Sequence, residues 1–219
     1  FLQINPGSGE DGGQPGGNIR VGFLFNPARL KIVRYREEKE GLPPSPSRIG
    51  VGSPAFQSSR KSLFCEFLFG RSRIFVINNH LSSKFGSPPM YGSRQPPVNG
   101  GFDRRVAQFG EISAVADRIA TAVPGAAILV LGDFNEFPFE EPMKSAGAGK
   151  ARLKKLSELL PLPERYTYNF QGNSQTLDHM LVSERLAAGA EYDVVHVNSE
   201  FAVQTSDHDP VVARLRVPR

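Results

Sequence analysis

The four aliphatic residues at 128–131 end at Gly132 and are followed directly by Asp133, Phe134 and Asn135. A short aliphatic run bounded by turn residues predicts a buried β-strand. Because side chains alternate along a strand, extended geometry through Gly132 would place Asp133 and Asn135 on one side and Phe134 on the other. In open α/β sheets, ligands bind at the carboxyl ends of the strands. The stretch is therefore either the edge of a functional site or a simple polar turn, since Asp and Asn also favour turns.

Three other segments place ionisable side chains beside strand-like runs. They are Asn78, Asn79 and His80 after 74–77, Asp178 and His179 within 176–182, and residues 206–210 before 211–212. A single histidine beside a strand is more simply explained as a surface or hydrogen-bonded residue. An ionised carboxylate beside a buried strand, however, needs a partner. Four such places in one chain therefore favour a shared site.

Strand-like runs predominate along the chain, and two helical segments lie among them. Apolar residues recur at helical spacing over 103–122, and a second helix is expected over 150–160. Strands are expected at 19–25, 30–35, 63–69, 74–78, 127–131, 167–170, 176–182, 192–197 and 211–217. Two segments rich in Pro and Gly, 37–59 and 82–101, show no period and are expected to be long loops. The pattern indicates one α/β or α+β domain over residues 1–219.

The composition sets broad limits on function. A chain of 219 residues can build one sizeable core. No apolar run approaches the length of a membrane span. The formal net charge of +4 suits a polyanionic partner, although mild basicity is common. The single cysteine, Cys65, excludes an intramolecular disulfide and a thiolate metal cluster, and its apolar neighbours predict a buried strand position.

An ordered set of motifs resembles the endonuclease/exonuclease/phosphatase superfamily, to which pancreatic deoxyribonuclease and the abasic-site endonucleases belong. The motifs are "NNHLSSK", "GDFNEFP", "TLDHMLVS" and "SDHDPVVARL". The resemblance is nearest to bacterial extracellular nucleases, through "SRKSLFCEF", "YTYNFQGNSQTLDH" and "YDVVHVN". It implies an α/β (α+β) fold of two packed mixed β-sheets flanked by helices, a four-layer sandwich. It also implies a monomeric, secreted bacterial enzyme.

The resemblance implies a chemical role for four of the matching residues. Asp133 resembles the residue that orients or deprotonates the attacking water. Asn135 resembles the amide that steadies this nucleophile and a phosphate oxygen. His208 resembles the imidazole that donates to the scissile phosphate, and Asp178 the carboxylate that fixes the tautomer of that imidazole.

Three further positions complete the set. His80 resembles a second histidine that protonates the leaving oxygen, and Arg60 an arginine that contacts phosphate. Asp207 resembles a ligand of the divalent metal ion. A hard cation held by carboxylates prefers oxygen ligands, so Mg²⁺ or Mn²⁺ is expected rather than Zn²⁺, with Ca²⁺ as an alternative structural ion.

Simpler interpretations suit the neighbouring polar residues. His179 alternates to the face opposite Asp178 and is expected to be packed or on the surface. Cations that flank the second long loop are expected to be solvated, with phosphate contact as the alternative. They are Lys84, Arg94, Arg104 and Arg105. Asp209 is expected to be a loop residue, and His196 to be structural.

Two signatures of the superfamily have no match in this chain. One is an Asn after the first strand, and the other is a metal-binding Glu in a "QE"-like motif. Gln3 is followed by Ile4, and Glu10 lies in a Gly-rich stretch that does not resemble the motif. The domain is therefore expected to be incomplete at its N-terminus, without its first strand or strands, a helix and one metal ligand. A preceding segment would then be needed for full activity.

The function expected from the resemblance is metal-dependent hydrolysis of the phosphodiester bonds of nucleic acid by in-line attack of water. The motifs leave DNA against RNA, and internal against terminal cleavage, open. One alternative is a phosphatase or phospholipase of the same superfamily. Another is an inactive fragment that acts only as a binding module.

Overall fold

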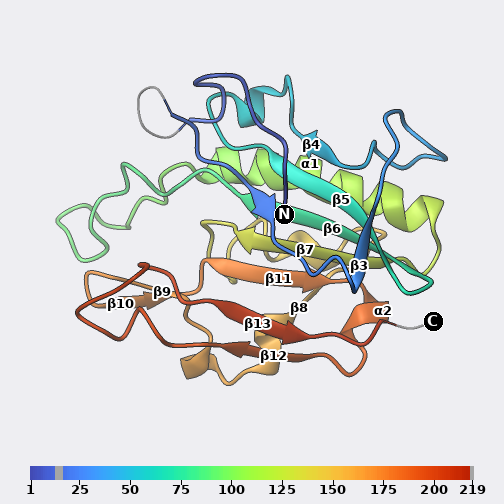
Figure 1. Ribbon diagram of the computed structural model, residues 1–219. Helices are drawn as coiled ribbons and strands as arrows, with labels where there is room; N and C mark the ends of the chain where they lie inside the picture. Colours follow the sequence, from blue (N-terminus) through green and yellow to red (C-terminus); the bar gives the residue numbers. More distant parts are fainter. Residues whose placement is uncertain (13–16, 218–219) are drawn as a thin grey trace.

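The computed structural model describes residues 1–12 and 17–217 and is built around a seven-stranded mixed sheet (Figure 1). The strand order is β3-β5-β6-β7-β11-β8, and β4 pairs with β5 beside this path. The strands are β3 (Leu30–Val33), β4 (Ser47–Ile49), β5 (Ser62–Phe69), β6 (Ser72–His80), β7 (Ala127–Asp133), β8 (Lys154–Lys155) and β11 (Asp178–Val182).

The central strands are apolar on both sides because both faces of the sheet are covered. Helix α1 (Phe102–Ala122) covers one face and packs Phe109, Ile112, Ala116 and Ile119 against it. Its extent confirms the helix predicted at 103–122. Side chains of the β-strands meet α1 on alternate positions, and the remaining positions, such as Cys65, face the other side.

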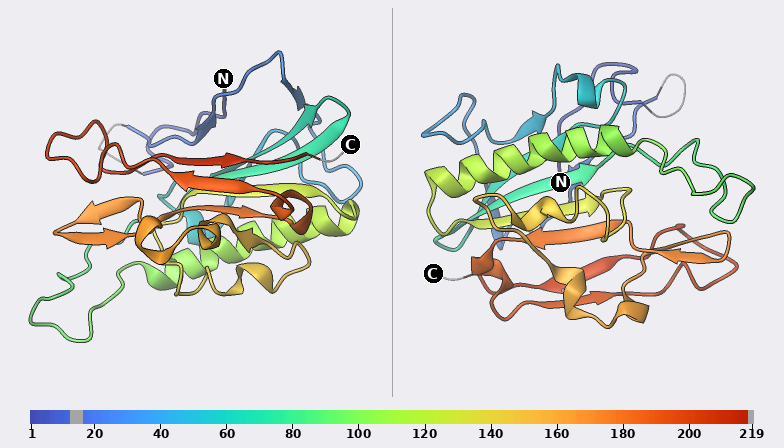
Figure 2. Two further views of the ribbon diagram at one scale, coloured as in Figure 1. Left: turned by 90° about the horizontal axis from the view of Figure 1, so that it is seen from below. Right: turned by 180° about the vertical axis from the view of Figure 1, so that it is seen from behind.

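Three two-stranded sheets complete the fold of the described residues. The pairs are β1 (Leu2–Gln3) with β2 (Gly22–Phe23), β9 (Tyr168–Phe170) with β10 (Asn173–Gln175), and β12 (Glu191–Val194) with β13 (Val211–Arg214). The β1–β2 and β12–β13 pairs pack on the face opposite α1, and Figure 2 shows α1, the main sheet and β12–β13 as successive layers. The predicted class, a mixed α/β fold of several packed sheets, is confirmed.

Short helical segments connect these strands. They are α2 (Glu184–Ala187) and the 3₁₀ turns η1 (Pro54–Phe56), η2 (Ser145–Gly147), η3 (Leu156–Leu159) and η4 (Leu162–Glu164). Within the ranges that the structure describes, none of the helices combines the length and apolarity needed to cross a membrane.

One edge of the main sheet gathers the ends of three strands. Strands β6 and β7 are parallel and end together, with His80 opposite Asp133. Strand β11 runs antiparallel to β7 and begins there, with Asp178 opposite Asp133. The loop 81–101 and the β9–β10 hairpin both extend beyond this edge (Figures 1 and 2). Residues far apart in the sequence are thereby brought to one place.

The sequence prediction is wrong at 150–160, where no α-helix forms. Strand β8 and the 3₁₀ turn η3 occupy this segment. Arg152 has φ 47°, a left-handed conformation that an α-helix excludes. The buried Leu153 and Leu156 produced the apolar spacing. The prediction also missed β1, β4, β8 and β10, which have two or three residues each.

A cavity of about 550 Å³ lies on the face of the main sheet opposite α1. Apolar side chains such as Phe67, Val76, Leu129 and Ala213 dominate its lining. None of the ionisable residues at the gathered strand ends lines it. The cavity is therefore separate from the polar edge described next.

Candidate active site

The strand β7 ends in a tight approach to β6 followed by a sharp turn. A Cβ atom on Gly132 would lie 2.0 Å from the carbonyl oxygen of Asn79, so only glycine lets the strands run this close. The extended geometry persists through Gly132 to Asp133 and ends there, because Asn135 has φ 50°. Its backbone N–H donates to Asp133 Oδ1 (2.7 Å) and its Nδ2 donates to Asp133 Oδ2 (2.9 Å). A turn, rather than strand alternation, brings the two polar side chains together, while Phe134 is buried in the core.

Asp133 lies between two ionisable neighbours. Its Oδ2 is 3.5 Å from His80 Nε2, and Asp178 is its partner in the β7–β11 register. Burial and the negative charge of Asp178 raise the pKa of Asp133 to about 7. A carboxyl group with this pKa exchanges protons with water near neutral pH, as a general base must.

His208 and Asp178 form a closely hydrogen-bonded pair. His208 Nδ1 is 2.6 Å from Asp178 Oδ2, and Thr167 Oγ1 donates to the same oxygen at 2.7 Å. Burial opposes the charge of the imidazole, but the hydrogen bond that it donates to Asp178, together with the negative charge of that carboxylate, outweighs burial and raises the pKa of His208 to about 9. The ring is therefore cationic at neutral pH, and Nε2 carries the proton that remains free to donate.

His80 has the opposite electrostatic character. Burial, together with the positive charges of Arg60 and His208, lowers the pKa of His80 to about 4. This imidazole is neutral at neutral pH. One edge of the sheet thus holds a neutral histidine, a carboxyl group that titrates near neutrality and a cationic histidine.

Arg60 enters the site from the segment before β5. Its side chain is buried, and its Nη2 donates to the carbonyl oxygen of Leu81 at 2.6 Å. The same carbonyl accepts from Asn135 Nδ2 at 3.2 Å. The Nε of Arg60 is buried without a hydrogen-bond partner in the described part of the chain. An unpartnered buried N–H group is costly, and an anion that reached it would supply the missing acceptor.

Asp207 lies at the rim. Its side chain is exposed, but its charge helps to raise the pKa of both His208 and Tyr168. Five of the seven residues predicted from the sequence lie together: direct contacts join three of them to one another and the other two to each other, and the β7–β11 register places the two groups side by side. Arg60 meets the first group at the carbonyl oxygen of Leu81, and Asp207 lies beside the second. The five are His80, Asp133, Asn135, Asp178 and His208.

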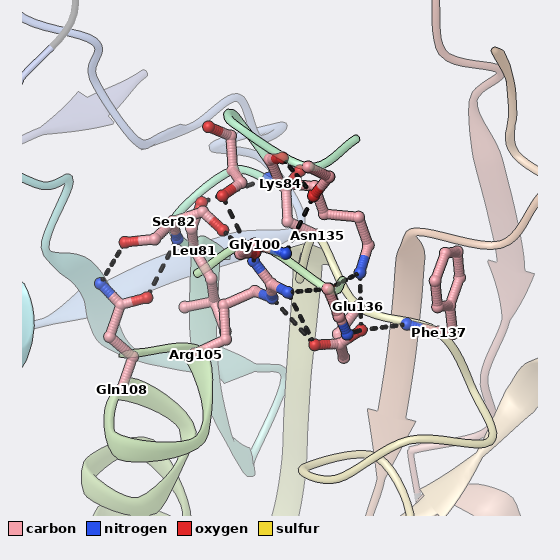
Figure 3. Close-up of polar contacts among 12 residues, drawn as sticks. Leu81, Ser82, Lys84, Gly100, Arg105, Gln108, Asn135, Glu136 and Phe137 are labelled. Atoms are coloured by element: carbon pink, nitrogen blue, oxygen red, sulfur yellow. Dashed lines mark hydrogen bonds and ion pairs between the residues drawn. The ribbon is translucent and has the colours of Figure 1, made fainter. Parts of the chain in front are cut away.

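A second polar cluster, here called the buried network, lies at the same edge on the α1 side of the sheet (Figure 3). It consists of Lys84, Asn99, Arg105 and Glu136. Arg105 and Glu136 are both fully buried, and Arg105 Nε donates to Glu136 Oε2 at 2.9 Å. Lys84 Nζ and Asn99 Nδ2 donate to Glu136 Oε1 at 2.8 and 2.9 Å. The expectation that these cations are solvated is wrong for Arg105 and Lys84.

The buried network fixes both ends of the loop 81–101. Arg105 Nη1 donates to the carbonyl oxygens of Ser82 (3.2 Å) and Gly100 (2.8 Å), which lie at the beginning and the end of the loop. Its partner Glu136 directly follows Asn135, and the backbone oxygen of Glu136 lies 2.9 Å from Nε2 of the buried His179. His179 is thus a packed residue, as its position in the strand predicts. Because Glu136 is fixed by Arg105 and His179, the network supports the adjacent turn at Asn135 from the α1 side of the sheet.

Sequence reasoning gave no role to Thr167 and Tyr168. Thr167 is buried and bonds Asp178, while the ring centroid of Tyr168 is 4.7 Å from that of His208. The alternation in "YTYNF" predicts their strand. The pairing of Tyr168 with His208, however, joins residues far apart in the sequence, so local pattern cannot predict it.

The carboxylates of the site are the side chains that could bind a divalent metal ion. Asp133, Asp178 and Asp207 provide the carboxylate oxygens that Mg²⁺ prefers. Within 1–12 and 17–217, however, no three or more His, Cys, Asp or Glu side chains converge closely enough to hold a metal ion. The described residues alone do not fit a complete metal site.

A family model described as "Endonuclease/Exonuclease/phosphatase family" matches residues 12–208. No sequence among the curated proteins matches significantly. Solved structures provide the remaining comparisons, all at low sequence identity, so they support the fold alone.

The human Nocturnin catalytic domain with bound sulfate superimposes with a TM-score of 0.58 at 17% identity, covering 86% of this chain and 61% of that domain. A D. rerio TDP2 complexed with single-strand DNA product gives a TM-score of 0.58 at 16% identity, with 91% and 73% covered. The mannosyl-6-phosphatase Bt3783 of Bacteroides thetaiotaomicron gives 0.62 at 15% identity, with 98% and 76% covered. The chain thus spans about three fifths of the Nocturnin domain.

Proposed function

The chain belongs to the endonuclease/exonuclease/phosphatase family, and from this premise we propose that it is a phosphodiesterase that hydrolyses nucleic acid. Family membership supports a hydrolase of phosphate esters. The choice of a nucleic acid substrate rests on the net charge of +4, on Arg60 and on the motif resemblance. One of the similar structures, the D. rerio TDP2, is described as complexed with single-strand DNA.

Asp133 activates the attacking water in this proposal. Its pKa of about 7 lets it accept a proton at neutral pH and release it after the reaction. Asn135 donates to both of its oxygens and so fixes the carboxylate in one orientation. A positioned general base contributes about 10²- to 10⁴-fold in rate.

His208 and Arg60 bind the phosphate group. Cationic His208, oriented through Nδ1 by Asp178, donates from Nε2 to a phosphate oxygen. The unpartnered Nε of Arg60 is a second donor. Donors that are already oriented stabilise the charge that develops on these oxygens, at about 10²- to 10³-fold each.

His80 lies beside the leaving oxygen. The sequence suggested that it donates a proton there, but its pKa of about 4 keeps it neutral at neutral pH. We therefore assign it a hydrogen bond to the leaving oxygen, with cationic His208 as the stronger acid of the pair. This division follows from the charge that each ring carries.

Enzymes of this family generally use a divalent metal ion. We propose Mg²⁺ or Mn²⁺ as the ion, with Asp207 as one ligand. Since the described residues do not form a complete metal site, the roles above involve only side chains of this chain.

The observation that carries the proposal is the convergence of Asp133, Asp178 and His208 at one sheet edge, where the pKa of Asp133 is raised to about 7 and that of His208 to about 9. Groups displaced by burial and by each other in one place mark a functional site. A polar turn at Asp133 and Asn135 would form without the neighbouring charges of Asp178 and His208.

A cleavage assay tests the proposal. Single-stranded and double-stranded oligonucleotides of DNA and RNA are incubated with Mg²⁺, Mn²⁺ or EDTA, for the wild type and for Asp133→Asn. We expect metal-dependent cleavage by the wild type only. Binding without cleavage under every condition would replace the enzyme with a binding module.

A phosphatase is the second candidate, because the fold is also that of Bt3783, described as a mannosyl-6-phosphatase. Salt distinguishes the two substrates. Binding of nucleic acid weakens steeply as salt rises, since several phosphates release counterions, whereas a small phosphate ester shows a shallow dependence. Release of inorganic phosphate from sugar phosphates, without cleavage of oligonucleotides, would favour the phosphatase.

A further inference from the structure

A ladder of three aromatic rings leads outward from the site. The ring of Tyr168 lies 4.7 Å from that of His208, tilted by 40°. Phe170 follows two residues later on the same face of β9, and its ring lies 6.2 Å from that of Tyr168 with only 13° between their planes. Both separations lie in the range of favourable aromatic pairs. The ladder joins the histidine assigned to the phosphate with the protein surface.

The hairpin that carries the ladder is fixed to the site. Tyr168 forms a β-bridge with His208, and the backbone N–H of Asp209 donates to the carbonyl oxygen of Thr167 at 2.7 Å. The two-residue turn at Gln171 and Gly172 has φ of 51° and 77°, the signs that a tight type I′ hairpin turn needs. The outer ring, Phe170, therefore keeps a defined position relative to His208.

The outer end of the ladder is open to solvent and uncharged. Phe170 is 49% exposed, so no other side chain covers the outer end of the stack fully. Residues 168–175 include no charged side chain, so nothing on the hairpin repels a phosphate chain. His208, the residue assigned to the phosphate, stands at the inner end. The ladder thus has the polarity of a nucleotide, with a phosphate-binding end and a flat apolar end.

Building on the proposed function, we propose that the β9–β10 hairpin binds the base next to the scissile phosphate by stacking on Phe170, and that the substrate is therefore single-stranded nucleic acid. A base inside a duplex already has its faces covered by neighbouring bases. Only an unpaired or splayed base offers a free face to a protein ring. Stacking needs no particular base, so little sequence preference is expected.

Binding of labelled oligonucleotides, followed by fluorescence anisotropy in EDTA so that cleavage does not interfere, tests this assignment. Removing one stacking ring typically weakens single-strand binding about 5- to 150-fold. We expect Phe170→Ala to raise the Kd for single-stranded oligothymidylate by such a factor, and Phe170→Trp to restore it. On an oligonucleotide without bases, the wild type and Phe170→Ala should bind equally.

Leu162→Ala, which removes an apolar side chain that is 75% exposed on η4, serves as the control and should leave the Kd unchanged. An equal Kd for Phe170→Ala and wild type on oligothymidylate overturns the stacking assignment. So does tighter binding of duplex than of single strand. If the wild type cleaves the single strand in either case, the proposed function stands without the ladder. If Phe170→Ala loses binding but the wild type cleaves nothing, the ladder stands and the proposed function falls.

Discussion

Two clusters of charged residues lie at the same edge of the main sheet, one on each face, and they differ in how their charges are satisfied. In the buried network, Arg105 and Glu136 are fully buried and their polar atoms meet partners on all sides. In the site cluster, defined as His80, Asp133, Asp178 and His208, two carboxyl groups face each other and two imidazoles differ in charge. The charged groups of the first cluster are paired with groups of opposite charge, whereas the second places two carboxyl groups beside each other.

The difference shows how structural and chemical charges can be told apart. Satisfied pairing in the buried network stabilises the ionised form of Glu136, and its pKa is lowered by Lys84, Asn99 and Arg105 against the effect of burial. In the site cluster, burial and like charge raise the pKa of Asp133 to about 7. A group kept near its titration point costs stability but gains reactivity.

The largest expected effect distinguishes the clusters by rate. Asp133→Asn should lower kcat about 10²- to 10⁴-fold, because it removes the proposed general base. Its stability at pH 8 should be unchanged or raised. The folded-state pKa of Asp133 is raised, so its stabilising contribution is complete only at low pH and is lost as pH rises through about 7.

Steady-state kinetics and urea unfolding measure the two quantities. Asp193→Asn, at an exposed position of β12, is the matched control and should change neither. A large loss of stability in Asp133→Asn, with an unchanged rate per folded molecule, would place Asp133 with the structural residues.

The next effect should appear in stability. Arg105→Ala leaves the carboxylate of Glu136 buried with weaker compensation, and breaking a buried pair in this way costs about 3–5 kcal/mol. Arg118→Ala is the control, because its pair with Glu38 is exposed and such pairs contribute about 0–1 kcal/mol. Urea unfolding of the two variants gives the comparison directly, and equal losses would remove the distinction between the clusters.

The smallest effect should appear in the pH profile. In the wild type, activity should rise through about pH 7 as Asp133 loses its proton and fall above about pH 9 as His208 loses its own. Asp178 raises both pKa values, so Asp178→Asn should move both limbs to lower pH. One pH unit corresponds to about 1.4 kcal/mol, less than the two effects above.

The measurement is kcat/KM against pH for wild type and Asp178→Asn at constant ionic strength. Opposite shifts of the two limbs, or an unchanged profile, would contradict the assignment of Asp133 and His208 to them. Thr167→Val, which removes another hydrogen bond to Asp178 but no charge, should shift the limbs much less.

Local pattern was enough to predict α1, the central strands and the association of Asp133 with Asn135. The strand is extended through Gly132 as that prediction required, and the turn that follows, with a φ of 50° at Asn135 and two hydrogen bonds to Asp133, fixes the association. Strand alternation did separate Asp178 from His179, since the two side chains face the site and the core respectively. Period and turn chemistry are local properties, so they can be read from a sequence.

Long-range partners were beyond the sequence. Arg105 and Lys84 looked like solvated loop cations because Glu136, which pairs with both, lies in another motif. Tyr168 acquires its importance only through its bridge to His208. The short strands β8 and β10 depend on pairing rather than on intrinsic pattern, since each has only two or three residues.

The parallel pairing of β6 with β7 has a consequence for how the protein folds. His80 and Asp133 become neighbours only when two strands separated by the whole of α1 close against each other. Such non-local closure is slow compared with forming a helix or the β5–β6 hairpin. During refolding, far-UV circular dichroism should therefore recover before catalytic turnover, and a chain interrupted between 81 and 101 should regain helical signal without regaining turnover.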